Sequence, residues 1–171
     1  QASIVSSAWS ISHGGDDVRK TYVFSYGHII NLHLDTEGIN GDLVTIEIYN
    51  LQTGTDRKID SYPKIPVVDG QINLEIKNTS TWRAKLRFTT EEEKFYIKVI
   101  ANGKYVKDNK NDDEHARFLR IKNKEVAHHP KPPVSTMPLK VGETQQKAGR
   151  YEPCKFDAIK ITETKNENGK Q

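Results

Sequence analysis

Apolar and polar residues alternate along most of the first 127 residues. In residues 71–77, Ile72, Leu74 and Ile76 occupy every second position and so face one side of an extended chain. A side-chain period of two is typical of a β-strand with one buried face. The same period recurs in residues 28–35, 43–49 and 95–100. The pattern therefore predicts these inward-facing core residues: Ile30, Leu32, Leu34, Val44, Ile46, Ile48, Ile72, Leu74, Ile76, Phe95, Ile97 and Val99.

Short runs rich in β-branched and aromatic residues predict further strands, at residues 4–11, 22–26, 65–68, 84–88, 104–106 and 117–122. The dipeptides Asp69-Gly70 and Asn102-Gly103 fit two-residue hairpin turns, which need positive φ angles. Strands that recur about every ten residues indicate an all-β sandwich or barrel. No stretch of helical length shows the apolar spacing of a helix. We therefore expect residues 89–93 to form a polar connection between two sheets.

The composition of the chain changes at His128. Residues 128–133 read His-His-Pro-Lys-Pro-Pro and predict a polyproline-like linker, because proline has no N–H to donate in a central strand. This divides the chain into a β-sandwich at residues 1–127, the Pro-rich linker, and a short C-terminal extension at residues 134–171. The extension either docks on the sandwich or begins a further module. The chain begins with Gln1 rather than Met, which we interpret as the start of a piece of a longer protein.

Charge and cysteine content narrow the classes of partner and site. The chain has 26 Lys and Arg against 23 Asp and Glu, a net charge of +3. Basic residues are mixed with acidic ones rather than gathered on one element, so we expect no nucleic-acid partner. No apolar run is long enough for a transmembrane helix, so we expect no membrane span. The single cysteine, Cys154, excludes an internal disulfide and a cysteine-cluster metal site, and we expect neither a metal nor another cofactor.

The sequence carries no recognisable catalytic motif. It has no Gly-x-Ser-x-Gly elbow, no His-Glu-x-x-His pair and no phosphate-binding loop of the Walker type. The densest cluster of titratable residues is 112–115, Asp-Asp-Glu-His, which we interpret as a solvated acidic loop. A cation site there, or a small hydrolase site built from Asp112, Asp113 and His115, is the competing hypothesis. We expect no catalytic residue.

Aromatic residues are the remaining candidates for a binding site. Trp9 lies inside a strand pattern, so we expect it in the core. We select Trp82, Tyr62 and Tyr105 as candidate contacts with a ligand or partner. Exposed Trp and Tyr rings stack on sugars or anchor protein interfaces. A glycan and a protein are therefore the two alternative partners.

Five segments resemble an Ig-like module of large effector and toxin-carrier proteins of Gram-negative bacteria, which are associated with type VI secretion and carry PAAR-like or LysM domains elsewhere. The resemblance covers about residues 4–122. It is carried by Ile-Val-Ser-Ser-Ala-Trp at 4–9, Tyr-Gly-His at 26–28, Leu-His-Leu-Asp-Thr-Glu-Gly at 32–38, Val-Thr-Ile-Glu-Ile-Tyr at 44–49, and Tyr-Ile-Lys-Val at 96–99 with its hairpin to 104–106.

The resemblance implies an Ig-like antiparallel β-sandwich without catalytic activity. It implies a structural or binding module of a secreted bacterial effector assembly, one that spaces or docks neighbouring domains of its chain or partner proteins. Such a protein is made in the bacterial cytoplasm and then secreted or injected. The alternatives are a carbohydrate-binding or adhesin-type module, and a small hydrolase with a site built from loops.

Overall fold

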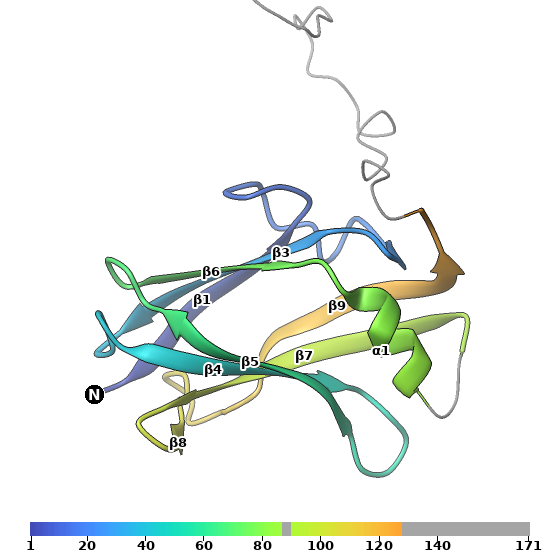
Figure 1. Cartoon of the computed structure of the whole chain (residues 1–171). Helices are drawn as coiled ribbons and strands as arrows, with labels where there is room; N and C mark the ends of the chain where they lie inside the picture. Colours follow the sequence, from blue (N-terminus) through green and yellow to red (C-terminus); the bar gives the residue numbers. More distant parts are fainter. Residues whose placement is uncertain (87–89, 128–171) are drawn as a thin grey trace, which may run out of the picture. The chain divides into compact units, whose positions relative to one another are not determined.

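A computed structural model describes residues 1–86 and 90–127, whose strands form two sheets packed as a sandwich (Figure 1). The first sheet has the strand order β1 (Ser3–Ser10), β3 (Ile30–Glu37), β6 (Gln71–Ile76). The second sheet has the order β2 (Phe24–Tyr26), β9 (His115–Glu125), β7 (Glu92–Ala101), β4 (Leu43–Asn50), β5 (Arg57–Pro66), with β8 (Lys104–Tyr105) beside β7. The prediction of an all-β sandwich is confirmed, and its Ig-like character stays a prediction.

The pairing is antiparallel throughout these strands except between β2 and β9, which run parallel. Both predicted hairpin turns are present. Asp69 and Gly70 have φ angles of 53° and 74°, and Asn102 and Gly103 have 53° and 77°. Two successive positive φ angles match the right-handed twist of the flanking strands, which is why these dipeptides stand there.

The core lies between the sheets and contains every predicted inward residue. All of these side chains are at most 9% exposed. Trp9 is buried among them, as predicted, and its indole Nε1 donates to the carbonyl oxygen of Ala116 at 2.7 Å. This hydrogen bond joins β1 of the first sheet to β9 of the second and satisfies a polar group that burial would otherwise leave unpaired.

The strand predicted at residues 84–88 is wrong. A short helix, α1 (Thr79–Lys85), follows β6 and includes Ala84 and Lys85, while residues 87–89 lie outside the described residues. The helix has only two buried side chains, Thr79 and Trp82, so it shows too little apolar spacing to be detected by periodicity. Figure 1 shows α1 at one end of the sandwich, where its Trp82 reaches the core.

β5 is longer than expected. The sequence predicted a strand only at residues 65–68, whereas β5 spans Arg57–Pro66. Its alternation is hidden by charged residues, by Pro63, and by register shifts along its pairing with β4. Proline and irregular pairing are typical of an edge strand, and β5 does lie at the edge of its sheet.

Some predictions concern residues that the structure does not describe. The Pro-rich linker at 128–133, the extension at 134–171 and Cys154 all lie outside the described residues. Contacts divide the chain into the units Gln1–Pro132 and Pro133–Gln171, and the described residues all belong to the first. Among the residues described, none of the helices has the length and apolar character needed to cross a membrane.

Candidate binding face on the second sheet

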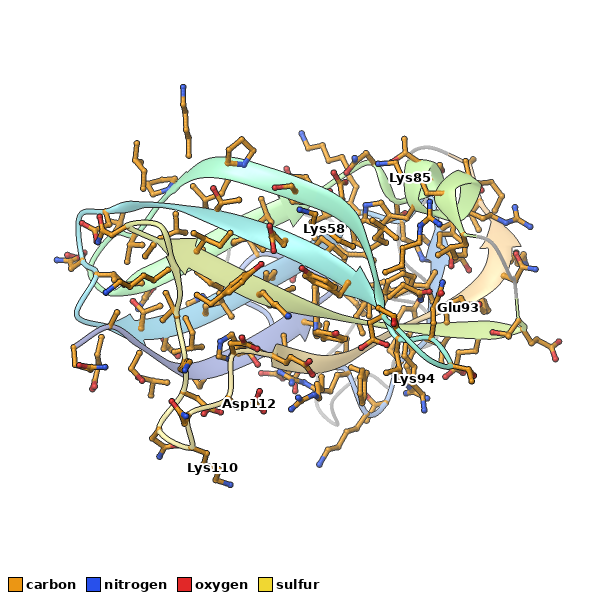
Figure 2. The ribbon with its side chains drawn as sticks, turned by 90° about the horizontal axis from the view of Figure 1, so that it is seen from below. Lys58, Lys85, Glu93, Lys94, Lys110 and Asp112 are labelled. Carbon is orange, nitrogen blue, oxygen red and sulfur yellow. The ribbon has the colours of Figure 1, made fainter. Side chains whose placement is uncertain are left out.

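The outward faces of the two sheets differ in chemistry. The outward positions of the first sheet carry no Phe, Tyr or Trp along its strands and are Ser6, Ala8, Ser10, Asn31, His33, Asp35, Gln71, Asn73 and Glu75. We call the opposite surface of the molecule the outer face of the second sheet. Its residues are Leu43, Thr45, Glu47, Tyr49, Lys58, Ser61, Lys94, Tyr96, Lys98, Ile100, Tyr105, Phe118 and Arg120. Figure 2 views this side and labels Lys58 on β5 and Lys94 on β7.

Three tyrosines on this face form a cluster with a lysine and a glutamate, Tyr49, Tyr96, Tyr105, Lys98 and Glu47, which we call the tyrosine cluster. The rings of Tyr49 and Tyr96 stack with centroids 5.5 Å apart and planes 11° from parallel. The Lys98 ammonium lies 4.7 Å from the Tyr49 ring centroid and 5.2 Å from that of Tyr105. A cation over aromatic rings is attracted by their negative faces.

Glu47 links members of the tyrosine cluster through hydrogen bonds. It lies at an outward position of β4, yet it is only 6% exposed. Its Oε1 accepts hydrogen bonds from the hydroxyls of Tyr49 at 3.2 Å and Tyr105 at 3.1 Å, and its Oε2 pairs with Lys58 at 3.2 Å. Burial, together with the neighbouring Tyr105 and Glu47, raises the pKa of the Tyr49 hydroxyl above its ordinary value. The Tyr49 hydroxyl therefore stays protonated and donates at physiological pH.

A second feature of the same face is a hollow of about 390 Å³ lined by Arg19, Lys20, Lys94, Arg117, Phe118 and Arg120, which we call the basic hollow. An irregularity in β9 forms one side of it. Phe95 pairs with Leu119 and Ile97 with His115, so three residues of β9 lie opposite Tyr96 alone. Extra residues in one strand re-aim its side chains. Phe118 then packs edge-on against Tyr96, with the two ring centroids 6.3 Å apart. This contact connects the basic hollow to the tyrosine cluster.

The five cations of the basic hollow are not equally neutralised. Arg19 pairs with Asp17 at 2.9 Å, and Arg117 pairs with Asp112 at 2.9 Å and Glu114 at 2.6 Å. Within residues 1–86 and 90–127, Lys20, Lys94 and Arg120 form no ion pair, and the lining contains no carboxylate. These three positive charges therefore stay available to an anion from outside.

The segment that carries Arg19 is fixed to β9 by hydrogen bonds. Arg19 donates from Nη1 to the Arg117 carbonyl at 2.8 Å and from Nη2 to the Ser7 carbonyl at 2.6 Å. Arg120 donates from Nε to the Arg19 carbonyl at 3.1 Å. The hollow is thus assembled from the β1–β2 connection, β7 and β9, and it is held in shape before any ligand arrives.

Two of the three predicted contact residues lie inside the sandwich rather than on this face. Trp82 is 0% exposed, and its Nε1 donates to Asp60 Oδ2 at 2.8 Å. Tyr62 is half-buried and donates its hydroxyl to Asn78 Oδ1 at 2.6 Å, while Asn78 donates to Asp60 at 3.0 Å. Trp82 and Tyr62 thus meet through one hydrogen-bonded network, because α1 closes over the end of β5.

Tyr105 alone of the three is exposed, at 42%, on the outer face of the second sheet. Trp82 has no exposed ring surface for a ligand, so its selection as a candidate contact is corrected, whereas Tyr62 is half-buried and its contact with a ligand or partner stays a prediction. Burial of the apolar indole ring of Trp82 in the core is energetically favourable, and its N–H has a hydrogen-bond acceptor there. A contact of Tyr105 with a ligand or partner stays a prediction.

The acidic loop is organised by an arginine. Arg117 binds both Asp112 and Glu114. The backbone N–H of Glu114, which donates to Asp112 at 2.9 Å, and the hydrogen bond from Arg117 hold the pKa of Asp112 below its usual range. His115 is buried, with Nε2 2.7 Å from the Val106 carbonyl oxygen. In the described part of the chain, no hydrogen bond joins Asp112, Asp113 and His115. No group of three His, Cys, Asp or Glu side chains suited to a metal occurs among the described residues.

Sequence reasoning missed a buried carboxylate next to the binding face. Glu93 is 6% exposed and accepts hydrogen bonds from Asn50 Nδ2 at 3.0 Å and from the Thr90 N–H and hydroxyl at 2.9 Å each. It borders a hollow of about 410 Å³ together with Leu51 and other residues. Three donors from the protein occupy this carboxylate, so Glu93 fixes the start of β7 beside Lys94 (Figure 2).

The basic hollow was missed as well. Its residues come from positions 19–20, 94 and 117–120, and the sequence around each basic residue predicts only a solvated surface charge. Only the pairing of β7 with β9 brings Lys94 opposite Arg120. The absence of carboxylates at the point where these segments meet has no counterpart in the linear sequence.

No known protein-family model matches the chain, and no curated protein is significantly similar to it. The resemblance to an Ig-like module of secreted effectors therefore stays a prediction.

Proposed function

We propose that this chain is a non-catalytic structural and binding module of a secreted bacterial effector assembly, and that it docks a partner protein or a neighbouring domain on the outer face of the second sheet. The contrast between the two outward faces carries this proposal. The outward positions of the first sheet are mostly polar, although Val5 is exposed on β1. The outer face of the second sheet combines the tyrosine cluster with the exposed Leu43 and with cations that form no ion pair among the described residues.

The composition of the outer face suits a protein interface. Leu43 is 61% exposed and Tyr105 42%, with Ile100 half-buried nearby in the sheet. Apolar and tyrosine side chains held on a rigid sheet lose little conformational entropy when a partner covers them. Lysines at the edge of the outer face of the second sheet favour a partner surface with acidic groups around its contact region.

Substitution of one exposed side chain by arginine on each sheet tests the docking surface. Leu43→Arg places a charge in the proposed interface, and Gln71→Arg, at an exposed outward position of β6 in the first sheet, is the matched control. Proteins retained from the producing bacterium by the full chain should be lost with Leu43→Arg and kept with Gln71→Arg. Equal retention by both variants would contradict docking on this face.

A carbohydrate-binding function is the second candidate, and the exposure of Tyr105 favours it. A glycan array distinguishes the two. Saturable glycan binding that Tyr105→Ala abolishes, without any retained protein, would replace protein docking by sugar recognition. The side chains of Asp112 and His115 are each engaged by other groups of the chain, so the hydrolase hypothesis has no comparable observation in its favour.

A further inference from the structure

The basic hollow brings like charges together without a counter-charge in its lining. Five of its six lining residues are basic, and the sixth is Phe118. Like charges that line one hollow repel one another, so their gathering carries an electrostatic cost that solvent reduces. An anion that enters the hollow removes that cost and gains attraction from several cations at once.

The three cations that form no ion pair within the described part of the chain differ in geometry. Arg120 uses its Nε for the Arg19 carbonyl, which fixes the guanidinium. The Lys94 ammonium lies 5.9 Å from the Phe118 ring centroid, and Lys20 also borders the hollow. A planar guanidinium matches the two oxygens of a carboxylate, and two ammonium groups attract a second acidic group beside it.

Two arginines of the basic hollow already bind carboxylates. Asp17 holds Arg19, and Asp112 and Glu114 hold Arg117. These acids come from the chain itself and pair with Arg19 and Arg117 only. Lys20, Lys94 and Arg120 line the same hollow but have no such acids among the described residues.

From this arrangement we propose that the basic hollow binds an acidic peptide segment, with two or more neighbouring Asp or Glu side chains, of the partner that docks on this face. The inference rests on the proposed function and names the chemistry of its partner. The carboxylates meet Lys20, Lys94 and Arg120, and an apolar part of the segment packs on Phe118. Binding weakens as the salt concentration rises, because the attraction is electrostatic and exposed.

The test uses the full chain and a fluorescein-labelled hexaglutamate peptide, with binding followed by fluorescence anisotropy. Hexaglutamate should bind saturably, and the same peptide made of glutamine should not. Lys94→Glu should weaken binding on the order of tenfold or more, since it replaces an attraction by a repulsion. Lys124→Glu makes the same charge change at the far end of β9, outside the hollow, and should change the affinity less than about twofold.

A conservative variant separates geometry from charge. Arg120→Lys keeps the positive charge but loses the guanidinium plane and the Nε–H bond to the Arg19 carbonyl, so hexaglutamate affinity should fall. A thermal midpoint within a few degrees of the wild type would show that the fold is kept. Equal affinity of Lys94→Glu and wild type would overturn the proposal. Inorganic pyrophosphate or a short single-stranded DNA that displaces hexaglutamate at a lower concentration would also overturn it, because the site would then prefer phosphate.

The two proposals can fail separately. If hexaglutamate does not bind but Leu43→Arg still abolishes retention of a partner, the docking function stands and the acidic-segment inference falls. If hexaglutamate binds as expected while Leu43→Arg retains every partner, the basic hollow acts as an independent site for acidic segments and the broader docking face is wrong.

Discussion

Asp60 on β5 connects this strand to α1 and to the residue before it by hydrogen bonds. It accepts hydrogen bonds from the Trp82 indole at 2.8 Å and from Asn78 at 3.0 Å. Burial by itself would raise the pKa of this carboxyl, but the hydrogen bonds from Trp82, the Ser61 N–H and Asn78 outweigh it and hold the pKa below its ordinary value. Asp60 therefore favours the folded state in its ionised form.

Replacement of Asp60 by Asn should destabilise the protein by about 1 kcal/mol at pH 7, an amount reduced by the partial exposure of the site. A carboxyl with a depressed pKa contributes stability above its unfolded pKa of about 3.9, and that contribution is lost as the pH falls through the folded value. Urea unfolding at pH 7 and pH 3 measures this. The difference between Asp60→Asn and wild type should shrink at pH 3, and an unchanged difference would exclude a role of the charge.

His28 provides a second dependence on pH. It is buried beside Phe24, and its Nδ1 accepts the Ser25 N–H at 3.0 Å. Burial, with a smaller effect of Lys122, lowers the pKa of this imidazole. The folded state therefore holds His28 neutral, and protonation favours unfolding.

The free energy of unfolding should fall as the pH drops below about 6.5, because the His28 imidazole binds a proton there in the unfolded state but only at a lower pH in the folded state. His28→Asn keeps an acceptor near the Ser25 N–H but does not titrate in this range. Its unfolding free energy should change less between pH 7.5 and 5.5 than that of the wild type. Parallel curves for the two proteins would show that another group causes the loss.

At the scale of elements, strands with a buried face were predictable and irregular ones were not. β3, β4, β6 and β7 show a clean alternation because each buries one row of apolar side chains. α1 and most of β5 were not predicted, since each is shaped by tertiary contacts: α1 by the burial of one tryptophan, and β5 by its place at an edge. Local pattern cannot report a contact that only the fold creates.

Gly27 is the point at which the turn after β2 meets the end of β9. Its φ is 98°, its N–H donates to Thr79 Oγ1 at 2.8 Å, and a Cβ at this position would lie 2.6 Å from the carbonyl oxygen of Val126. An L-residue here is both strained and in collision with backbone. The glycine thus permits the parallel pairing of β2 with β9.

Gly27→Ala should lower the free energy of unfolding by about 2–3 kcal/mol, from backbone strain and steric displacement together. Gly103→Ala is the matched control, since its φ is also positive, at 77°, but no atom lies within 4 Å of the added Cβ. It should cost about 1 kcal/mol, the strain alone. Denaturant midpoints measure both variants, and equal losses would show that the approach of Val126 is unimportant.

At the scale of the whole molecule, the core was predictable and the candidate binding face was not. The inward residues follow from the period of two, which the sequence displays directly. A strand with one buried face leaves its alternate positions exposed, yet Glu47 and Tyr96 occupy such positions and are only 6% and 2% exposed. Their burial comes from neighbours on other strands, such as Tyr105 and Phe118, whose proximity depends on sheet order.

A chain that ends after Ala127 should fold and unfold in one cooperative transition. The described core residues, from Ile4 to Ile121, form one cluster that spans both sheets. Small domains with a single core usually unfold in an all-or-none manner. Thermal unfolding by circular dichroism should give the shortened and full chains the same midpoint, and a loss of several degrees would show that residues 128–171 stabilise the sandwich.

The two buried tryptophans give the protein a pair of built-in optical reporters. The indole N–H of Trp9 meets a neutral carbonyl oxygen, whereas that of Trp82 meets the charged Asp60. An excited indole responds to charge beside its pyrrole ring, so the emission of Trp82 should shift as Asp60 is protonated while that of Trp9 stays constant. Trp9→Phe and Trp82→Phe variants would isolate each signal. Stopped-flow fluorescence could then time the closure of β1 on β9 separately from the docking of α1.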